Sequence, residues 1–242
     1  MSLRKTFVVT GVTSGIGASL SARLLDEGAT VVGIGRDPEK LAAQSARLGA
    51  RFAPVTIDLA DPEARAHGFA DIAARWPQLD GLVSNAAECV YETPLSLDPE
   101  RWRTLLETNV LAGLDLVRTL APRLTPGAGH VVLLSSVTAR FLPNVRFSPY
   151  ALTKVAVEQL TTALRLELDP LGHRVTLITP GLVDTPIYDK VTGFAATRAR
   201  ISEQVPTWLA PDDVADAIVW SLTRPAHVVV ADLVLMPRGQ AR

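Results

Sequence analysis

Short apolar runs alternate with longer amphipathic stretches along the whole chain. The runs are rich in Val, Ile and Leu and mostly lack polar alternation, which is typical of parallel strands covered on both faces. They predict strands at residues 6–9, 30–34, 51–57, 81–84, 130–135, 174–178 and 227–233. The stretches between them predict helices at residues 15–27, 38–48, 62–75, 99–124, 150–168 and 211–222.

The regular alternation of strands and helices predicts the fold class. It favours an α/β protein with a doubly wound, Rossmann-type parallel sheet of about seven strands and helices on both faces. No low-complexity linker or break in composition divides the chain, so residues 1–242 are expected to form a single domain. One segment, at about residues 184–208, departs from the rhythm and follows the sixth strand. Because ligands bind beyond the carboxyl ends of the strands in such sheets, we expect this segment to be a substrate lid.

Composition narrows the class of protein further. Hydrophobic residues make up 48% of the 242 positions and charged residues 20%, which argues against disorder and for a sizeable core. The formal net charge is −1 without a long run of either sign, so nothing suggests a nucleic-acid partner. No segment approaches the roughly 18 apolar residues of a membrane span, and the apolar run at residues 7–9 is too short for a secretory signal. We therefore expect a cytoplasmic globular protein that binds neither nucleic acid nor membrane.

The cysteine and histidine content argues against a disulfide and against a metal site. Cys89 is the only cysteine, so an intrachain disulfide and a thiolate cluster are excluded. We interpret it as a small buried hydrophobe. The histidines, at positions 67, 130, 173 and 227, share no spacing, and none of them requires a metal.

A glycine-rich turn directly follows the first predicted strand and opens the first predicted helix. Glycines at such a turn permit a close approach of the backbone to a pyrophosphate, and the free N–H groups and dipole of the helix N-terminus attract its negative charge. An ordinary strand–helix turn would look alike, but its place in the first strand–helix unit favours a dinucleotide site. The turn consists of Thr10, Gly11, Val12, Thr13, Ser14, Gly15, Ile16 and Gly17.

Tyr150 and Lys154 lie four residues apart near the start of a long predicted helix. This spacing puts both side chains on one helical face, one turn apart. An unperturbed phenol has a pKa of about 10. A nearby ammonium group favours phenolate, which would bring Tyr150 closer to acid–base work near neutrality. The pair alone is weak evidence, because any helix can carry it by chance.

The motifs, taken in order along the chain, resemble the short-chain dehydrogenase/reductase family. The glycine-rich turn is similar to the family's cofactor loop, and Tyr150 with Lys154 is similar to its catalytic motif. Further matches are Asn85-Ala86-Ala87 after the fourth strand, where the family usually has Asn-Ala-Gly, Asn109 in the long helix, Ser135-Ser136 at the end of the fifth strand, and Pro180-Gly181-Leu182-Val183-Asp184-Thr185 after the sixth. The resemblance covers nearly the whole chain and implies hydride transfer between a nicotinamide cofactor and a small carbonyl or alcohol substrate.

The resemblance implies a catalytic group of Asn109, Ser136, Tyr150 and Lys154. Tyr150 would exchange a proton with the substrate oxygen, Lys154 would lower the pKa of Tyr150 and bind the nicotinamide ribose, and Ser136 would orient the carbonyl. Ser135 would point to the opposite face if the strand persists. Asn109 would help to hold a water in a proton relay with Lys154. Its alternative is a polar residue that faces solvent or forms hydrogen bonds within the protein.

The end of the second strand bears on the choice between NAD and NADP. An acidic side chain here can bind the ribose hydroxyls of NAD, whereas Arg accommodates the 2′-phosphate of NADP. Asp37 precedes Pro38, and the two fit a helix N-cap followed by Pro at the first helical position. Gly35 occupies the place where NAD-preferring relatives carry the acid, and the guanidinium of Arg36 suits a phosphate. We therefore predict NADP(H), with NAD as the less favoured cofactor.

The resemblance also assigns cofactor contacts along the chain. Asp58, just after the third strand, matches the contact to the adenine amino group, although a turn or N-cap role fits it nearly as well. Ala87 replaces the usual glycine and asks for ordinary backbone angles. The predicted cofactor-binding residues are Thr10, Gly11, Thr13, Ser14, Gly15, Ile16, Gly17, Arg36, Asp58, Leu59, Asn85, Ala86, Tyr150, Lys154, Pro180, Gly181, Val183 and Thr185.

Together these features predict an NADP(H)-dependent oxidoreductase that interconverts a carbonyl and a secondary alcohol. The alternative is a non-catalytic NADP-binding regulatory protein, which has no need of a matched Ser, Tyr and Lys. Two substrate classes stay open. The segments 225–228 and 235–238 resemble relatives that act on small 3-hydroxy acids and serine-like compounds. In the lid, Phe194 and Trp208 suit a bulky apolar ketone, while the neighbouring Arg198 and Arg200 suit a carboxylate.

The helix at 150–168 also bears on assembly. It carries apolar residues around much of its circumference, including Leu152, Val155 and Val157. One apolar stripe suffices to pack a helix against a sheet, so a second apolar face implies a subunit partner. The resemblance implies a homodimer or a homotetramer.

Overall fold

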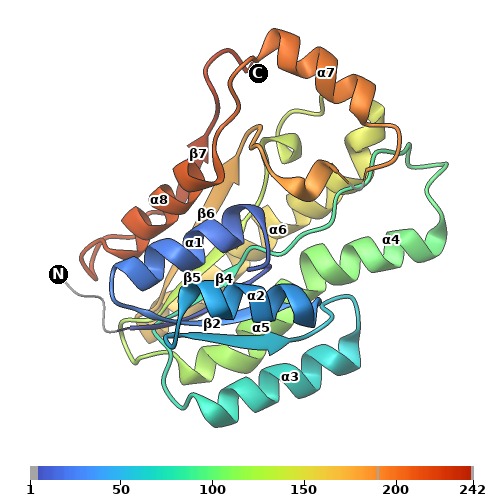
Figure 1. Ribbon diagram of the computed structural model, residues 1–242. Coiled ribbons are helices and arrows are strands. Elements are labelled where there is room, and N and C mark those ends of the chain that lie inside the picture. The colour runs from blue at the N-terminus through green and yellow to red at the C-terminus, as the bar shows by residue number, and fades with distance from the viewer. Residues whose placement is uncertain (1–4, 190, 241–242) are drawn as a thin grey trace.

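The computed structural model describes residues 5–189 and 191–240 (Figure 1). Positions 1–4 and 241–242 of the predicted domain, and position 190 inside the predicted lid, lie outside this description. Within the described residues the chain forms a single parallel sheet with helices on both of its faces, so the predicted fold class is confirmed.

The sheet has seven strands in the order β3-β2-β1-β4-β5-β6-β7, all parallel. The chain runs from β1 outward to β3, returns to the middle at β4 and then proceeds to β7. Ligands in such sheets bind where the strand order reverses, which here is the carboxyl end of β1 and β4. The strands are β1 (Thr6–Thr10), β2 (Thr30–Gly35), β3 (Phe52–Thr56), β4 (Gly81–Ser84), β5 (His130–Leu134), β6 (Arg174–Pro180) and β7 (Asp232–Leu235).

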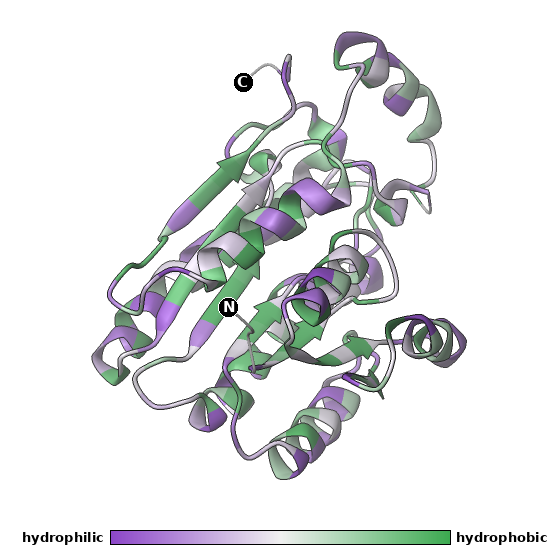
Figure 2. Ribbon diagram, turned by 60° about the vertical axis from the view of Figure 1, so that its left-hand side comes forward, coloured by the Kyte–Doolittle hydropathy of each residue, from purple (hydrophilic) through white to green (hydrophobic). Residues whose placement is uncertain are grey.

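Two layers of helices cover the sheet. One face is covered by α1 (Gly15–Asp26), α2 (Pro38–Leu48) and α8 (Pro211–Leu222), and the other by α3 (Pro62–Arg75), α5 (Ala112–Leu120) and α6 (Ser148–Leu168). Figure 2 shows hydrophobic strands in the middle and hydrophilic stretches on the helices. The protein therefore has a three-layer arrangement.

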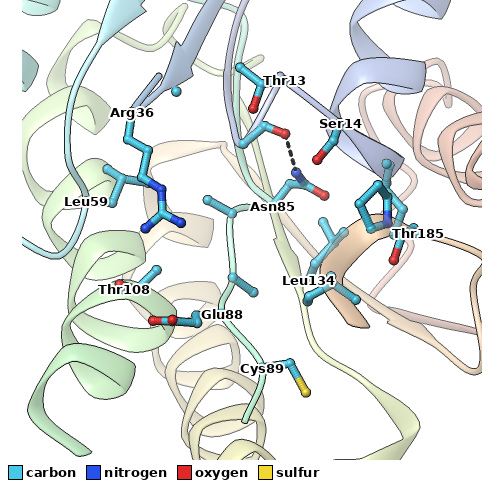
Figure 3. Close-up of a pocket in the computed structure, with 18 of the residues that line it drawn as sticks. Thr13, Ser14, Arg36, Leu59, Asn85, Glu88, Cys89, Thr108, Leu134 and Thr185 are labelled. Carbon is cyan, nitrogen blue, oxygen red and sulfur yellow. Dashed lines mark hydrogen bonds between the residues drawn. The ribbon is translucent and has the colours of Figure 1, made fainter. Parts of the chain in front are cut away.

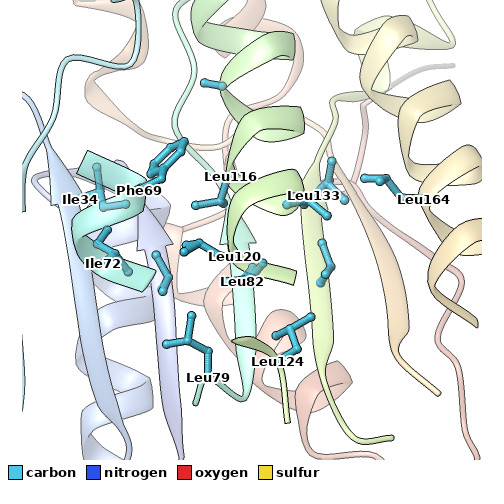
Figure 4. Packing of buried hydrophobic residues seen from close by; sticks show 14 of the residues in the cluster. Ile34, Phe69, Ile72, Leu79, Leu82, Leu116, Leu120, Leu124, Leu133 and Leu164 are labelled. Atoms are coloured by element: carbon cyan, nitrogen blue, oxygen red, sulfur yellow. The ribbon is translucent and has the colours of Figure 1, made fainter. Parts of the chain in front are cut away.

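Alternate residues of the strands β1 to β6 supply the two cores. Val8 of β1 faces α3, α5 and α6, whereas its neighbours Phe7 and Val9 face α1, α2 and α8. Successive strand residues point to opposite faces, which is why runs of Val, Ile and Leu without polar alternation were predictive. Figure 4 shows the first of these cores, where Phe69 and Ile72 of α3 pack beside Leu116 and Leu120 of α5. Each such side chain stabilises the fold by about 1.5–3 kcal/mol.

The prediction of one long helix at 99–124 is wrong, because the structure has several elements there. It consists of α4 (Pro99–Leu106), a π-helical turn η1 (Glu107–Leu111), α5 and a closing 3-10 turn η2 (Ala121–Arg123). The π turn places Asn109 in the interior, where it is buried and hydrogen-bonded. Pro122 has no N–H group for a further helical hydrogen bond, and so the last turn tightens.

The last strand was predicted too early, at 227–233, and is found at Asp232–Leu235. Its pairing with β6 starts only at Leu177 with Asp232. In the preceding segment, Arg174 donates to the Val228 carbonyl, and Arg165 donates to that of Ala231, which also accepts from the Leu177 N–H at 3.1 Å. The other predicted strands agree with the structure within two residues at each end.

The predicted lid segment contains a 3-10 turn η6 (Pro186–Tyr188) and the helix α7 (Ala195–Gln204), which lies apart from the sheet in Figure 1. Two further 3-10 turns, η3 (Val137–Ala139) and η4 (Val145–Phe147), connect β5 to α6, and a third, η5 (Asp169–Leu171), follows α6. Among the described helices, none is both long and apolar enough to cross a bilayer.

Candidate active site

A cleft of about 560 Å³ runs along the carboxyl ends of the central strands. Figure 3 shows Arg36 and Leu59 on one side of it, Ser14 and Thr185 on the other, and Asn85 between them. The structure thus brings together most of the predicted cofactor residues. Those that line the cleft are Gly11, Thr13, Ser14, Gly15, Ile16, Arg36, Asp58, Leu59, Asn85, Ala86, Tyr150, Lys154, Pro180, Gly181, Val183 and Thr185.

The glycine-rich turn has a conformation that requires glycine. Gly11 has a φ of 74°, in the left-handed region. A Cβ on Gly17 would lie 2.2 Å from the carbonyl oxygen of Gly11. Ser14 is the N-cap of α1 and makes no side-chain capping bond. The N–H groups at this helix start are therefore available to an anion such as a pyrophosphate.

Thr10 and Gly17 stand behind the cleft wall rather than in it. Thr10 is 2% exposed, and its hydroxyl accepts hydrogen bonds from the N–H groups of Asn85 (3.0 Å) and Ala86 (2.9 Å). The Asn85 amide donates in return to the Thr10 carbonyl at 2.8 Å. These bonds tie the end of β1 to the segment after β4. Ala87 needs no left-handed backbone, since every described residue with positive φ is a glycine.

At the end of β2, Asp37 and Arg36 have the separate roles that the sequence predicted. The Asp37 carboxylate caps α2 and accepts hydrogen bonds from the N–H groups of Lys40 and Glu39, both at 3.1 Å. The bond to Lys40 is the main cause of its lowered pKa. Arg36 is exposed in the cleft and has no salt bridge within the described part of the chain. A cation at this place suits a phosphate, which fits NADP(H) better than NAD.

Tyr150 and Lys154 lie on the cleft side of α6, one turn apart as predicted. The Lys154 side chain is buried, and its Nζ donates a hydrogen bond to the Leu134 carbonyl at 2.8 Å. This nitrogen lies 5.6 Å from the centre of the Tyr150 ring. The ammonium group is therefore anchored on β5 beneath the phenol.

Burial controls the protonation of both groups. It lowers the pKa of Lys154 from 10.5 to about 8. It raises the pKa of Tyr150 well above 10, with smaller contributions from Cys89 and Tyr188, and a hydrogen bond with Ser136 opposes this increase. The expected lowering of the Tyr150 pKa by Lys154 is not seen, because desolvation of the phenol is the largest effect on this pKa. The phenol is therefore neutral, which is the form that donates a proton.

Ser135 and Ser136 have different surroundings. Ser135 donates hydrogen bonds to the Lys154 carbonyl (3.3 Å) and to the Glu158 carboxylate (3.2 Å), so its hydroxyl stabilises the contact between β5 and α6. Ser136 instead accepts from the N–H and hydroxyl groups of Thr138 and lines the cleft together with Tyr150. Ser136 is thus the hydroxyl beside the phenol.

The Asn109 side chain makes its hydrogen bonds within the protein, as the alternative interpretation proposed. Its Oδ1 accepts from the Glu88 N–H at 2.7 Å, while its Nδ2 donates to the Glu88 carbonyl at 2.9 Å and to the Thr153 hydroxyl at 3.0 Å. It is 5% exposed and does not line the cleft. Asn109 therefore fixes Glu88, which does line the cleft, and its role in a relay stays a prediction.

Asp58 fits both of its interpretations. Its carboxylate accepts a hydrogen bond from the Ala60 N–H at 3.0 Å, which is a turn role, and the residue also lines the cleft. On the opposite side, Thr185 lies against the glycine-rich turn, since a Cβ on Gly15 would be 3.1 Å from its methyl group. The cleft is therefore bounded at both ends by residues that the sequence had singled out.

Aromatic side chains from separate segments meet beside Tyr150. We call Tyr91, Phe147, Tyr188, Phe194 and Trp208 the aromatic cluster. The rings of Phe147 and Phe194 lie 5.0 Å and 5.4 Å from that of Tyr91, and Tyr188 stacks on Phe194 at 5.0 Å. The Tyr188 ring also meets that of Trp208 at 5.8 Å.

Hydrogen bonds connect Tyr91 of the aromatic cluster to α7 in the predicted lid and to the segment before α6. The Tyr91 hydroxyl forms hydrogen bonds with Thr197 of α7 at 3.0 Å and with Asn144 at 3.2 Å. Arg198 is paired with Asp184 (2.7 Å) and Asp189 (3.2 Å). The lid arginine that suited a substrate carboxylate therefore already has two carboxylate partners.

Several residues of the cleft were not predicted from the sequence. Cys89 is buried as expected, and burial raises its pKa to about 12, but it also lines the cleft. Glu88 and Thr108 adjoin the Asn85-Ala86-Ala87 motif and Asn109, and this adjacency was the available signal. The unpredicted lining residues are Ile34, Gly35, Asp37, Lys40, Ile57, Ala60, Glu88, Cys89, Arg101, Thr108, Leu134 and Ser135, whereas Ala87 belongs to a matched motif and Pro186, Ile187 and Tyr188 belong to the predicted lid.

Comparison with protein families agrees with this geometry. The family model for short chain dehydrogenases matches residues 5–194. The chain belongs to the short-chain dehydrogenase family. It is therefore an oxidoreductase, and the alternative of a non-catalytic regulatory protein is set aside.

Similar proteins extend over almost the entire chain. A protein named serine 3-dehydrogenase from Rhizobium radiobacter is 34% identical over 237 residues, which cover 98% of this chain and 95% of the relative. An NADP-dependent 3-hydroxy acid dehydrogenase from Salmonella typhi is 31% identical and is matched over 97% of this chain and 95% of its own length.

Solved structures are also similar to this chain over almost its entire length. A serine dehydrogenase in a closed form with NADP+ has a TM-score of 0.88 and 29% identity, over 98% of this chain and 96% of that one. A short chain dehydrogenase from Burkholderia cenocepacia J2315 in complex with NADP has a TM-score of 0.85 and 28% identity, over 96% of both chains.

Proposed function

We propose that this oxidoreductase uses NADP(H) to interconvert a carbonyl and a secondary alcohol. The observation that carries the proposal is the arrangement of three side chains. Tyr150 lies above the buried Lys154, and Tyr150, Lys154 and Ser136 line the same cleft that the glycine-rich turn opens. These are the residue types that proton transfer to a carbonyl oxygen requires.

The residues of the cleft fit the two ends of NADP. The N–H groups at the start of α1 would hold the pyrophosphate, and Arg36 would hold the 2′-phosphate. Pro180, Gly181 and Thr185 line the opposite end, where the nicotinamide would lie. When bound, the nicotinamide supplies or accepts the hydride.

The protein's own side chains handle the proton and the substrate oxygen. In reduction, neutral Tyr150 donates its proton to the carbonyl oxygen, and in oxidation the phenolate form of Tyr150 accepts the proton from the alcohol. Ser136 donates a hydrogen bond to the same oxygen and stabilises the charge that develops there. Lys154 holds the ribose of the cofactor. Asn109 helps to hold a water through which Lys154 is reprotonated.

The substrate class that we favour is a small 3-hydroxy acid or a serine-like compound. The names of the two relatives described above support this class. A specific observation favours a second class, apolar ketones, because the aromatic cluster packs beside Tyr150 and Arg198 is already paired. Segment 184–208 would act as the lid over either substrate.

A substrate panel tests these assignments. The rate of NADP+ reduction is measured with 3-hydroxybutyrate and L-threonine, a 3-hydroxy acid and a serine-like compound that are secondary alcohols, and the rate of NADPH oxidation with cyclohexanone and acetophenone. A higher kcat/KM for the acids supports the first class, and a higher value for the ketones supports the second. Absence of turnover with a broad set of both would contradict the proposed function.

We also propose that the chain forms a homodimer or homotetramer through α6. Two apolar side chains on this helix, Leu152 and Val155, are 54% and 41% exposed in the single chain. Leu106 and Leu111, from α4 and the adjoining π turn, are 41% and 38% exposed. Light scattering at micromolar concentration tests this proposal, which a monomer would contradict. The expected cytoplasmic location also stays a prediction.

A further inference from the structure

Arg65 is a fully buried charged side chain that belongs to none of the sequence motifs. It lies on α3, and 2% of it is exposed. An arginine keeps its charge in proteins, so burial of this kind requires compensating partners. The contacts of its guanidinium must therefore offset the free-energy cost of its desolvation.

The guanidinium of Arg65 makes three contacts in three directions. Its Nη1 donates to the Leu59 carbonyl at 2.7 Å, its Nη2 to the Glu107 carboxylate at 2.6 Å, and its Nε to the Asp115 carboxylate at 3.0 Å. The two carboxylates are 26% and 21% exposed. Charge-assisted bonds of this type are shorter and stronger than those between neutral groups.

These contacts join two walls of the cleft that are far apart in the sequence. Leu59 lines the cleft from the segment between β3 and α3. Glu107 opens the π turn, and its neighbour Thr108 lines the cleft on the other side of the same end. Arg36 is close by on the Leu59 side, as Figure 3 shows. The single buried guanidinium of Arg65 thus holds together the two walls of the cleft at the end where Arg36 lies.

Removal of the guanidinium has two predictable consequences. The Leu59 carbonyl loses its donor, and the carboxylates of Glu107 and Asp115 are left as neighbouring like charges. Because both carboxylates lie on the π turn and α5, loss of the guanidinium removes the attraction that holds these elements against α3, which changes the distance between the two walls.

We propose that Arg65 is a positioning residue that sets the width of the adenosine end of the cofactor cleft. The inference rests on the proposed function, because it takes Arg36, Leu59 and Thr108 as the site of the adenosine half of NADP. Arg65 touches neither the cofactor nor the substrate and acts through Leu59 and the π turn.

The test uses probes for the two halves of the cofactor. Adenosine 2′,5′-bisphosphate reports on the adenosine end by calorimetric titration. Reduced nicotinamide mononucleotide reports on the other end by the turnover that it supports with the best carbonyl compound of the panel. In Arg65→Met we expect bisphosphate binding to weaken about tenfold, since a charge-assisted contact to one wall is lost, while turnover with the mononucleotide stays within about twofold.

The control is Arg118→Met. Arg118 is exposed and pairs with Asp115 at 2.9 Å but contacts neither Leu59 nor Glu107, so this variant should bind the bisphosphate normally. Arg65→Lys should recover only part of the binding, because an ammonium group cannot reach three partners in a fixed fork. Should Arg65→Met fail to fold in circular dichroism, Glu107→Gln carries the same test.

The outcomes separate the inference from the proposed function. Equal losses for both probes, or an unchanged affinity for the bisphosphate, would overturn the positioning role of Arg65. A wild-type protein that binds no bisphosphate at all would instead contradict the proposed placement of the cofactor.

Discussion

The two ends of the cleft are built by different means. At the cofactor end, the surface of the cleft is formed mainly by backbone groups. Hydrogen bonds such as that from the Asn85 amide to the Thr10 carbonyl hold the strand ends in register. At the substrate end, side chains from distant segments meet in the aromatic cluster, and α7 joins it through the hydrogen bond of Thr197 with the Tyr91 hydroxyl and through Arg198, which lies 5.2 Å from the centre of the Trp208 ring. The comparison teaches that cofactor binding depends on exact backbone geometry, whereas substrate choice depends on side-chain packing that can change without loss of the fold.

The largest effect is expected at the cofactor end, from Gly17→Ala. The new Cβ would lie 2.2 Å from the Gly11 carbonyl oxygen and 2.5 Å from the Asn85 amide nitrogen, so the turn must shift. We expect NADPH affinity to fall at least about 100-fold, as misplacement of a binding group by about 1 Å does. Fluorescence titration of NADPH measures this. Ala22→Ser on the same helix is the control, and near-normal affinity in Gly17→Ala would refute the requirement for glycine.

Protonation of Lys154 provides a test by pH. The unfolded chain binds this proton up to the ordinary pKa of 10.5, whereas the folded chain loses it near pH 8. The unfolded state therefore binds more protons between these values, and the free energy of unfolding should increase with pH in this window. Relative to Lys154→Met, we expect a gain of about 2 kcal/mol between pH 8 and pH 10 in urea unfolding. A difference that does not change with pH would contradict the burial of a charged lysine.

A smaller effect is expected from Arg36→Leu. Loss of the guanidinium removes the partner of the 2′-phosphate but no contact to NAD, which lacks this group. We expect NADPH to bind about tenfold more weakly and NADH to be unaffected, because one charge-assisted contact is lost. Parallel titrations measure both affinities. Arg47→Leu, on α2, is the control, and an equal loss for both cofactors would rule out phosphate recognition by Arg36.

The smallest effect is expected at the substrate end, from Tyr91→Phe. This variant keeps the ring in the aromatic cluster but loses the hydroxyl bonds to Thr197 and Asn144. Because two partly exposed hydrogen bonds disappear, we expect the substrate KM to increase about three- to fivefold, with the affinity for NADPH unchanged. Steady-state kinetics separates the two. A parallel loss of NADPH affinity would show that the two ends of the cleft are not independent.

Much of the fold could be predicted from the sequence because its signals are local. Runs such as the one containing Val8 are apolar on both faces, and this pattern identifies buried parallel strands. The π turn could not be predicted, since the apolar pattern continues through it and its cause is long-range, in the bonds of Asn109 to Glu88 and of Arg65 to Glu107. The start of the edge strand β7 was predicted too early. The segment before it runs beside Arg174, whose side chain donates a hydrogen bond to the Val228 carbonyl.

The site divides in the same way. Glycines and the Asp37 cap are dictated by local geometry, so they were found. Cys89 faces the cleft only because the chain folds back from distant segments, and no spacing indicates this, whereas Tyr188 lies within the segment that was predicted as the lid. The raised pKa of Tyr150 likewise depends on burial, which the four-residue spacing to Lys154 does not reveal.

The account depends most directly on the proton of Tyr150. Tyr150→Phe removes the hydroxyl and leaves the ring above Lys154, so NADPH binding measured by fluorescence titration should stay within about twofold. Turnover with the best substrate of the panel should fall at least about 100-fold, the contribution typical of a general acid. Substantial residual turnover in a variant that binds NADPH normally would contradict the assignment of Tyr150 as the proton donor.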